Sequence, residues 1–277
     1  MKSKWGKSLA TLTECALMIA LSTVLSVFKL FELPYGGSIT LASCLPLVVL
    51  SYRHGVRYSV PSALCASLIQ ALLGLKNFSY FTTWQSIVAL LVFDYVIAFA
   101  IFGFSGIFKK IIKIQSVSMI AGAVFASVIR YICHVISGAT IWAGLSIPTE
   151  AALLYSLSYN ATYMIPETII VVLCTAYLGS ALNLKREIPV RVRSEKLDTI
   201  SVYSLILAGL AMLAVLITDT VLVFSKLQNY SSGEFMIEAL KDVDWHIVLA
   251  VTAVGIIISA SLVVITMIRS KRQSVRG

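Results

Sequence analysis

The sequence predicts an all-α integral membrane protein: a bundle of six helices followed by two additional C-terminal transmembrane helices. Of its 277 residues, 58% are hydrophobic and only 13% are charged, and the mean hydropathy is +0.91. A soluble domain carries about twice that charged fraction, and a soluble exterior this apolar would aggregate. The apolar residues also fall into blocks, most of them near the roughly 20 residues that a helix needs to cross a bilayer.

Eight apolar blocks follow one another along the chain. They cover residues of about 9–31, 38–52, 57–75, 84–107, 115–143, 151–182, 199–225 and 246–268. The first block has no convincing small-residue cleavage site, so we interpret it as a retained helix and not as a signal peptide. The second block is short and contains Pro46, which predicts a broken or tilted segment of the kind tolerated only inside a bundle.

One break in composition divides the chain. Residues 183–198 read NLKREIPVRVRSEKLD, a charged stretch between apolar blocks. We therefore predict a six-helix domain over residues 1–182, a cytoplasmic linker over 183–198, and a two-helix transmembrane extension of unknown role over 199–277.

Basic residues are concentrated in every second loop. The formal net charge is +9, and most Lys and Arg residues lie within 2–7, 53–57, 109–113, 185–196 and 269–276. Since cytoplasmic loops are enriched in Lys and Arg, both termini are predicted to be cytoplasmic. The clusters are too small to form a groove for nucleic acid, so the predicted surroundings are a lipid bilayer.

The sequence predicts neither an enzyme nor a metal or cofactor protein. The five cysteines lie far apart without a C-x-x-C pair, which is typical of small buried residues and not of a zinc site. A nucleophile–base pair and an H-E-x-x-H motif are both absent. A G-x-x-x-x-G-K-[ST] phosphate loop is also absent, so the chain cannot be an ATP-driven motor by itself.

Ionisable residues inside membrane spans are costly, and each is a candidate for function. They are Glu14, Asp94, Arg130, His134, Glu167 and Asp219. With a helical rise of ~1.5 Å per residue, Asp94 and His134 both lie ~15 Å below the outer surface. Asn160 lies ~14 Å below it, with Tyr155 above it and Trp142 at the rim. These groups from three helices predict an outward-facing pocket.

The residue types in this layer suit a flat, cationic heterocycle. A carboxylate neutralises the positive charge, the Trp142 indole attracts it, and an amide with the phenols of Tyr95, Tyr155 and Tyr159 can hydrogen-bond ring nitrogens. Structural alternatives remain open at this stage. Asp94 can be the counter-ion of Arg130, His134 a packing residue, Trp142 an interfacial residue, and Asn160 a link between helices. Glu14, Glu167 and Asp219 favour a structural role, and His54 that of a loop residue.

Four ordered motifs resemble one family. They are LPYGGSITLASCLPLVVLSYRHG (33–55), QSIVALLVFDYVIAFAIFGFSG (85–106), RYICHVISGATIWA (130–143) and YSLSYNATYMIPE (155–167). Together they resemble the thiamine-specific S components, the substrate-binding subunits of energy-coupling factor (ECF) transporters. The resemblance covers residues of about 8–182 and leaves the two-helix extension outside it.

The resemblance implies a thiamine site near the outer surface. His134 and Trp142 would stack on the thiazolium and pyrimidine region, and Asp94, followed by Tyr95, would face the positive ring. Tyr155 and Asn160 would hydrogen-bond the aminopyrimidine. Two further aromatic contacts match less closely. Trp84 lies near one of them, and Tyr35, between the first two helices, is the candidate for a lid.

The resemblance also implies partners. S components bind a membrane-embedded T component, which works with two ATPase subunits, through small residues on the first helix. Ala16 and Ala20 form a small-x-x-x-small pattern that permits close helix approach. The chain would then capture thiamine at the bacterial cell membrane for ATP-driven import. The alternatives are an S component for another vitamin and a solitary, ion-coupled thiamine transporter.

Overall fold

The computed structural model describes residues 4–33, 36–143, 145, 152–192, 199–227 and 237–274. The chain forms two compact units, Met1–Arg191 and Val192–Gly277, each with its own internal packing. Tyr35, the candidate lid residue, lies outside the described residues.

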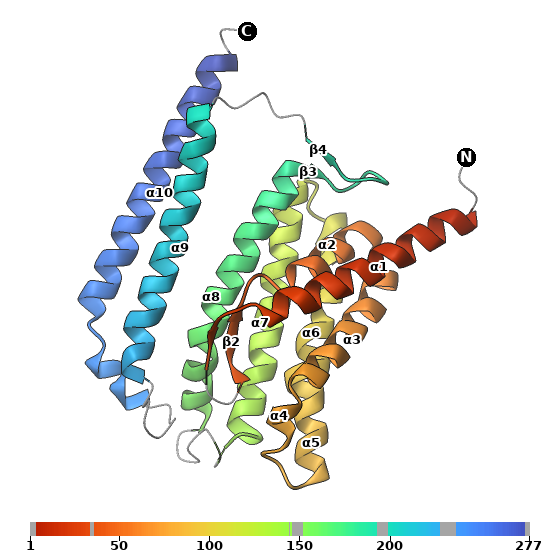
Figure 1. Ribbon diagram of the computed structural model, residues 1–277, viewed down its shortest axis with the longest axis vertical. Coiled ribbons are helices and arrows are strands. Elements are labelled where there is room, and N and C mark those ends of the chain that lie inside the picture. Colours follow the sequence, from red (N-terminus) through yellow and green to blue (C-terminus); the bar gives the residue numbers. More distant parts are fainter. Residues whose placement is uncertain are drawn as a thin grey trace. The chain divides into compact units, whose positions relative to one another are not determined.

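The first unit is a bundle of six helical segments (Figure 1). They are α1 (Lys4–Val27), α2 (Leu45–His54), α3 (Val56–Leu73), a composite fourth helix, α7 (Gln115–Thr140) and α8 (Ala152–Ala181). The composite helix consists of α5 (Trp84–Leu90), η2 (Leu91–Ile97), α6 (Ala98–Ala100) and η3 (Ile101–Lys110). A four-residue helix, α4 (Leu75–Phe78), precedes it. The predicted six-helix architecture is therefore confirmed.

Two small antiparallel hairpins complete this unit. β1 (Lys29–Glu32) pairs with β2 (Ser38–Thr40), with Glu32 opposite Ser38 and Lys29 opposite Thr40. β3 (Leu182–Asn183) pairs with β4 (Val190–Arg191) directly after α8. The first hairpin connects α1 to α2, and the second follows the last helix of the bundle.

Six helical stretches among the described residues are long and apolar enough to cross a membrane. Five belong to the first unit: Ser8–Val27, Val56–Leu73, Trp84–Lys110, Gln115–Thr140 and Ala152–Ala181. The sixth, Trp245–Thr266, belongs to the second unit. The chain is thus a multi-pass membrane protein.

The second apolar block is not a full-length helix. Its first residues form β2, and only ten residues form α2, which rises ~15 Å against a hydrocarbon core of ~30 Å. Pro46 stands in the first turn of α2, where its missing N–H has no helical partner to lose. All residues from Pro46 to Tyr52 are buried, so the segment lies inside the bundle.

The fourth helix changes its winding in mid-span. Residues Leu91–Ile97 form a π-helical turn and Ile101–Lys110 a 3₁₀ helix. Such π turns are rare and occur frequently at functional sites. This turn contains Asp94 and Tyr95.

Serine hydroxyls and glycines bring three segments into close contact. Ser51 Oγ donates to Gly103 O at 2.6 Å and accepts from Gly106 N at 2.8 Å. Ser59 Oγ donates to Gly103 O at 2.6 Å. A Cβ at Gly106 would overlap the Ser51 carbonyl, so the absence of a side chain there lets η3 pack on α2.

A charged cluster joins α1, α2 and the second hairpin. Arg53 binds both carboxylate oxygens of Glu14 and donates to the carbonyls of Leu184 at 2.9 Å and Glu187 at 3.0 Å. His54 Nε2 lies 2.9 Å from Glu14 Oε2. The prediction for His54 was therefore wrong. It is the last residue of α2 and contacts a carboxylate of α1, because the helix extends two residues further than the apolar block.

The second unit consists of α9 (Thr199–Leu227), η4 (Ile237–Asp242) and α10 (Trp245–Ser274). α9 and α10 run side by side (Figure 1). Thr252 Oγ1 donates to Asp219 Oδ2 at 2.6 Å and so links the two helices, while Asp219 Oδ1 is buried without a hydrogen-bond partner among the described residues.

The close approach at Gly106 predicts a stability effect. Gly106→Ala should lower the free energy of unfolding by about 1–3 kcal/mol, because the new methyl group forces η3 away from α2. Thermal unfolding of the detergent-purified protein measures the effect. Gly209→Ala is the matched control, since nothing lies within 4 Å of its Cβ position and alanine favours the helix. Equal melting temperatures for both variants would contradict this packing.

Candidate functional site

A cavity of about 570 Å³ lies in the first unit, at the end of the bundle where α1, α3 and α7 end and α8 begins. The β1–β2 hairpin lines one side of it through Gly36, Gly37, Ser38 and Thr40. Helix residues line the remainder, among them Asn77, Asp94, Tyr95, Arg130, His134, Trp142, Tyr159, Asn160 and Tyr163. Non-helical backbone at this depth is tolerated because it borders a cavity.

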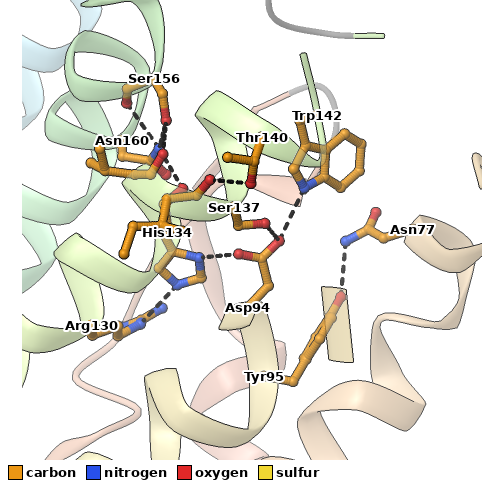
Figure 2. Close-up of polar contacts among 12 residues, drawn as sticks. Asn77, Asp94, Tyr95, Arg130, His134, Ser137, Thr140, Trp142, Ser156 and Asn160 are labelled. Carbon is orange, nitrogen blue, oxygen red and sulfur yellow. Dashed lines mark hydrogen bonds and ion pairs between the residues drawn. The ribbon is translucent and has the colours of Figure 1, made fainter. Parts of the chain in front are cut away.

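Three hydrogen-bond donors hold the Asp94 carboxylate (Figure 2). Two of them lie on α7, and the third lies two residues after the end of that helix. Oδ1 lies 3.0 Å from His134 Nδ1. Oδ2 accepts from Ser137 Oγ at 2.8 Å and from Trp142 Nε1 at 3.0 Å. A carboxylate that is only 13% exposed needs such donors to compensate for lost water. Ser137 follows His134 by three residues and Trp142 follows Ser137 by five, which places all three groups on one side of the end of α7.

An aromatic wall surrounds Trp142. Its ring lies 5.0 Å from that of Phe81 in an edge-to-face arrangement and 5.9 Å from that of Tyr80. Both distances fall in the range in which aromatic pairs attract one another. The indole is buried on this side while its N–H points to Asp94.

Tyr95 leaves the π turn in a different direction from Asp94. Its hydroxyl accepts from Asn77 Nδ2 at 3.0 Å and donates to Gly74 O at 3.3 Å. Its ring stacks on Phe78 at 5.4 Å. The turn thus presents two adjacent polar residues to the same cavity, Asp94 toward α7 and Tyr95 toward the corner of α3 and α4 (Figure 2).

Asn160 connects α8 to α7. Its Nδ2 donates to His134 O at 3.2 Å and to Ser156 O at 2.9 Å, and its Oδ1 accepts from Tyr163 Oη at 2.6 Å. The Tyr163 ring lies 6.4 Å from the His134 ring. Asn160 therefore aligns the backbone of the helix that carries the Asp94 donors.

Arg130 pairs with Glu167 and not with Asp94. Its Nη1 donates to Glu167 Oε2 at 2.8 Å, and its guanidinium lies 4.5 Å from the centre of the Phe99 ring. The alternative that Asp94 serves as counter-ion of Arg130 is wrong, because Glu167 on α8 takes that place.

The structure brings most of the predicted site residues together. Asp94, Tyr95, His134, Trp142 and Asn160 all border the cavity. Tyr155 packs against the cluster that contains Trp142 and is not among the described residues that line the cavity, whereas Tyr159, one turn further along α8, borders it. Trp84 is 70% exposed at the start of α5 and is not among the described residues that line the cavity.

Sequence reasoning missed several lining or supporting residues, among them Gln70, Asn77, Ser137 and Tyr163. Ser137 and Tyr163 follow His134 and Asn160 by three residues, so helical spacing would have placed them on the same faces. Asn77 gave no signal, because it lies in a short helix outside the apolar blocks.

Ala16 and Ala20 lie away from this cavity on α1. Both are exposed, on the same side of the helix as Leu9, Leu12 and Leu17. This side of the helix is apolar and has small residues one turn apart, which permits a second helix to approach closely.

A bundle of membrane-length helices around a cavity with aromatic walls and a few convergent polar groups defines an integral membrane protein with a small-molecule site. That arrangement is typical of membrane transporters, whose sites lie among the helices.

Comparison with known proteins identifies the kind of transporter. Residues 12–185 match the family described as "Thiamine transporter protein (Thia_YuaJ)". The chain is 34% identical over 195 residues to the thiamine transporter ThiT of Bacillus subtilis (strain 168), covering 66% of this chain and 97% of that protein. The chain therefore belongs to the family of thiamine transporter proteins.

A solved structure shares the fold. ThiT from Listeria monocytogenes superposes with a TM-score of 0.52 at 22% identity, covering 62% of this chain and 94% of that one. The family match ends at residue 185, so α9 and α10 lie outside it.

Proposed function

We propose that this chain is the substrate-binding membrane subunit of an ECF-type transporter and captures thiamine from outside the cell. The observation that carries the proposal is the Asp94 carboxylate, whose side chain is only 13% exposed, in an aromatic-lined cavity. A carboxylate there neutralises a cation in surroundings that water screens poorly. Membership in the thiamine transporter family makes the thiazolium ring the natural candidate for that cation.

In this proposal, different cavity residues bind the charged ring and the aminopyrimidine of thiamine. Asp94 faces the thiazolium, while the rings of His134 and Trp142 stack on the ligand. Asn160 hydrogen-bonds the aminopyrimidine, as does Tyr155 once it turns inward or Tyr159 in its place. Tyr95 supports the cavity next to Asp94, and Tyr35 and Trp84 are the further aromatic candidates. The protein itself would catalyse no chemical step.

The orientation follows from the charges. Arg53, Lys109 and Lys185 lie at the end of the bundle opposite the cavity, where Arg53 contacts the β3–β4 hairpin and Lys109 the last turns of α2. Basic residues mark the cytoplasmic side, so the cavity opens outward and both termini are cytoplasmic in a bacterial cell membrane.

Import then requires partners. The exposed stripe with Ala16 and Ala20 would bind the membrane-embedded T component, and two ATPase subunits attached to it would supply ATP hydrolysis. Because small residues let two helices pack closely, this side of α1 can bind a transmembrane helix of a partner.

Binding of thiamine tests the proposal directly. Thiamine should quench the tryptophan fluorescence of the purified protein, because it stacks on Trp142. Asp94→Asn should weaken thiamine binding by about tenfold or more, the effect of ~1.4 kcal/mol. Deazathiamine is a neutral analogue in which carbon replaces the thiazolium nitrogen. Its affinity should fall far less on Asp94→Asn. Binding of another vitamin in place of thiamine contradicts the substrate, and equal losses for both ligands contradict the role of Asp94.

Coupling is tested on α1. Ala16→Trp and Ala20→Trp should abolish thiamine uptake in cells that contain the partner subunits, while binding in detergent persists, because the indole prevents close helix approach. Leu68→Trp, on the exposed face of α3, is the matched control and should leave uptake intact. Normal uptake by both alanine variants shows that the partner binds elsewhere.

The extension is tested by truncation. We propose that residues 1–182 hold the thiamine-binding domain and 199–277 an appended pair of helices. Of the predicted linker, 183–198, the residues up to Arg191 belong to the β3–β4 hairpin of the first unit, so the boundary lies after Arg191. A chain ending near Glu195 should insert and bind thiamine within about tenfold of the full-length affinity. A truncated protein that purifies in folded form but does not bind places the last two helices at the site.

A further inference from the structure

A buried ion pair lies beside the proposed thiamine site. Glu167 is 2% exposed and Arg130 is 8% exposed. Glu167 Oε2 accepts from Arg130 Nη1 at 2.8 Å, and Glu167 Oε1 accepts from Thr40 Oγ1 at 2.5 Å. The carboxylate therefore joins α8 to α7 and to the strand that lines the cavity.

One imidazole separates this pair from Asp94. Arg130 Nε lies 3.4 Å from His134 Nε2, and His134 Nδ1 lies 3.0 Å from Asp94 Oδ1. A guanidinium only donates hydrogen bonds, so His134 Nε2 accepts and Nδ1 carries the hydrogen directed at Asp94. Arg130 and Asp94 thus favour the same tautomer, in which His134 donates to the carboxylate (Figure 2).

The formal charges of this network are the buried Arg130 guanidinium, the buried Glu167 carboxylate and the part-buried Asp94 carboxylate. A guanidinium keeps its charge in proteins. With Glu167 in place, its charge is matched, and the charge of Asp94 remains for the ligand. Without Glu167, the nearest carboxylate along the hydrogen-bond chain is Asp94 itself. The guanidinium would then cancel the negative charge of Asp94 and repel a bound cation.

Charges at the mouth of the cavity contribute less. Lys29 pairs with Glu32 at 2.6 Å, and their side chains are 39% and 57% exposed. Lys76 is exposed as well. Water and salt screen such groups, so the buried network dominates the preference for a charged ligand.

We propose that Glu167 is a specificity-determining residue, which selects a cationic ligand by holding the Arg130 guanidinium away from the charge of Asp94. The inference rests on the proposed function, that the cavity binds thiamine. It assigns Glu167, which touches no ligand in this proposal, an electrostatic role beyond that of joining helices.

The ratio of the thiamine and deazathiamine dissociation constants tests the role. The two ligands share their shape, so a general loss of packing lowers both affinities and leaves the ratio unchanged. Glu167→Gln should reduce the preference for thiamine by at least about tenfold, because it leaves the guanidinium unmatched. Adding Arg130→Met in the double variant should restore the preference to within about threefold of wild type.

Glu32→Gln is the matched control. It also removes a carboxylate from a cation that lines the cavity, but in an exposed pair, so it should change the ratio far less than Glu167→Gln. If Glu167→Gln does not fold, Arg130→Met alone carries the test, and its preference for thiamine should equal or exceed that of wild type.

Two results overturn the inference. In the first, Glu167→Gln weakens both ligands equally, which is the signature of a structural residue. In the second, the double variant remains as unselective as the single one. A wild-type protein that fails to bind thiamine overturns the proposed function, whereas a selective wild type with an unchanged ratio in Glu167→Gln overturns this inference alone.

Discussion

The arrangement of the first unit depends on holding one carboxylate, largely withdrawn from water, among apolar helices. Asp94 is held by His134, Ser137 and Trp142, all supplied by α7 or the residues directly after it. Three well-placed donors offset the loss of water, which would otherwise make a charge at this depth untenable. Other features serve this geometry. The π turn aims Asp94 at α7, and Asn160 fixes the backbone of α7 at His134.

The same rule of matched charges recurs in the bundle. Arg130 and Glu167 join α7 to α8 near the cavity, and Glu14 and Arg53 join α1 to α2 at the opposite end. Each ion pair connects two consecutive helices of the bundle. Removing one partner of a buried pair is more damaging than never having the pair, because it leaves a charge in low-dielectric surroundings. Binding site and helix packing are therefore parts of one electrostatic arrangement.

Sequence reasoning reached the features that depend on local pattern. Apolar blocks predict helices, and residue spacing places Asp94, His134 and Asn160 in one layer, because depth along a helix follows from residue number. It did not reach the π turn at Asp94 or the β1–β2 hairpin, because a count of apolar residues does not distinguish these local conformations from a regular helix or loop. It also did not reach the partner of Arg130, which a different helix supplies. Glu167 looked structural for this reason, since nothing near it in the sequence reveals which cation it meets.

The short second helix has a consequence for how the protein is made. With ten residues, α2 is too short to be held in a bilayer by itself, and its buried side chains gain nothing until neighbouring helices surround them. We expect the stretch from α1 through α3 to leave the insertion machinery as one block, with α2 entering only when α3 follows it. We therefore expect the stretch from α1 through α3, which contains the β1–β2 hairpin beside the cavity, to assemble during biosynthesis and not by the later association of finished helices.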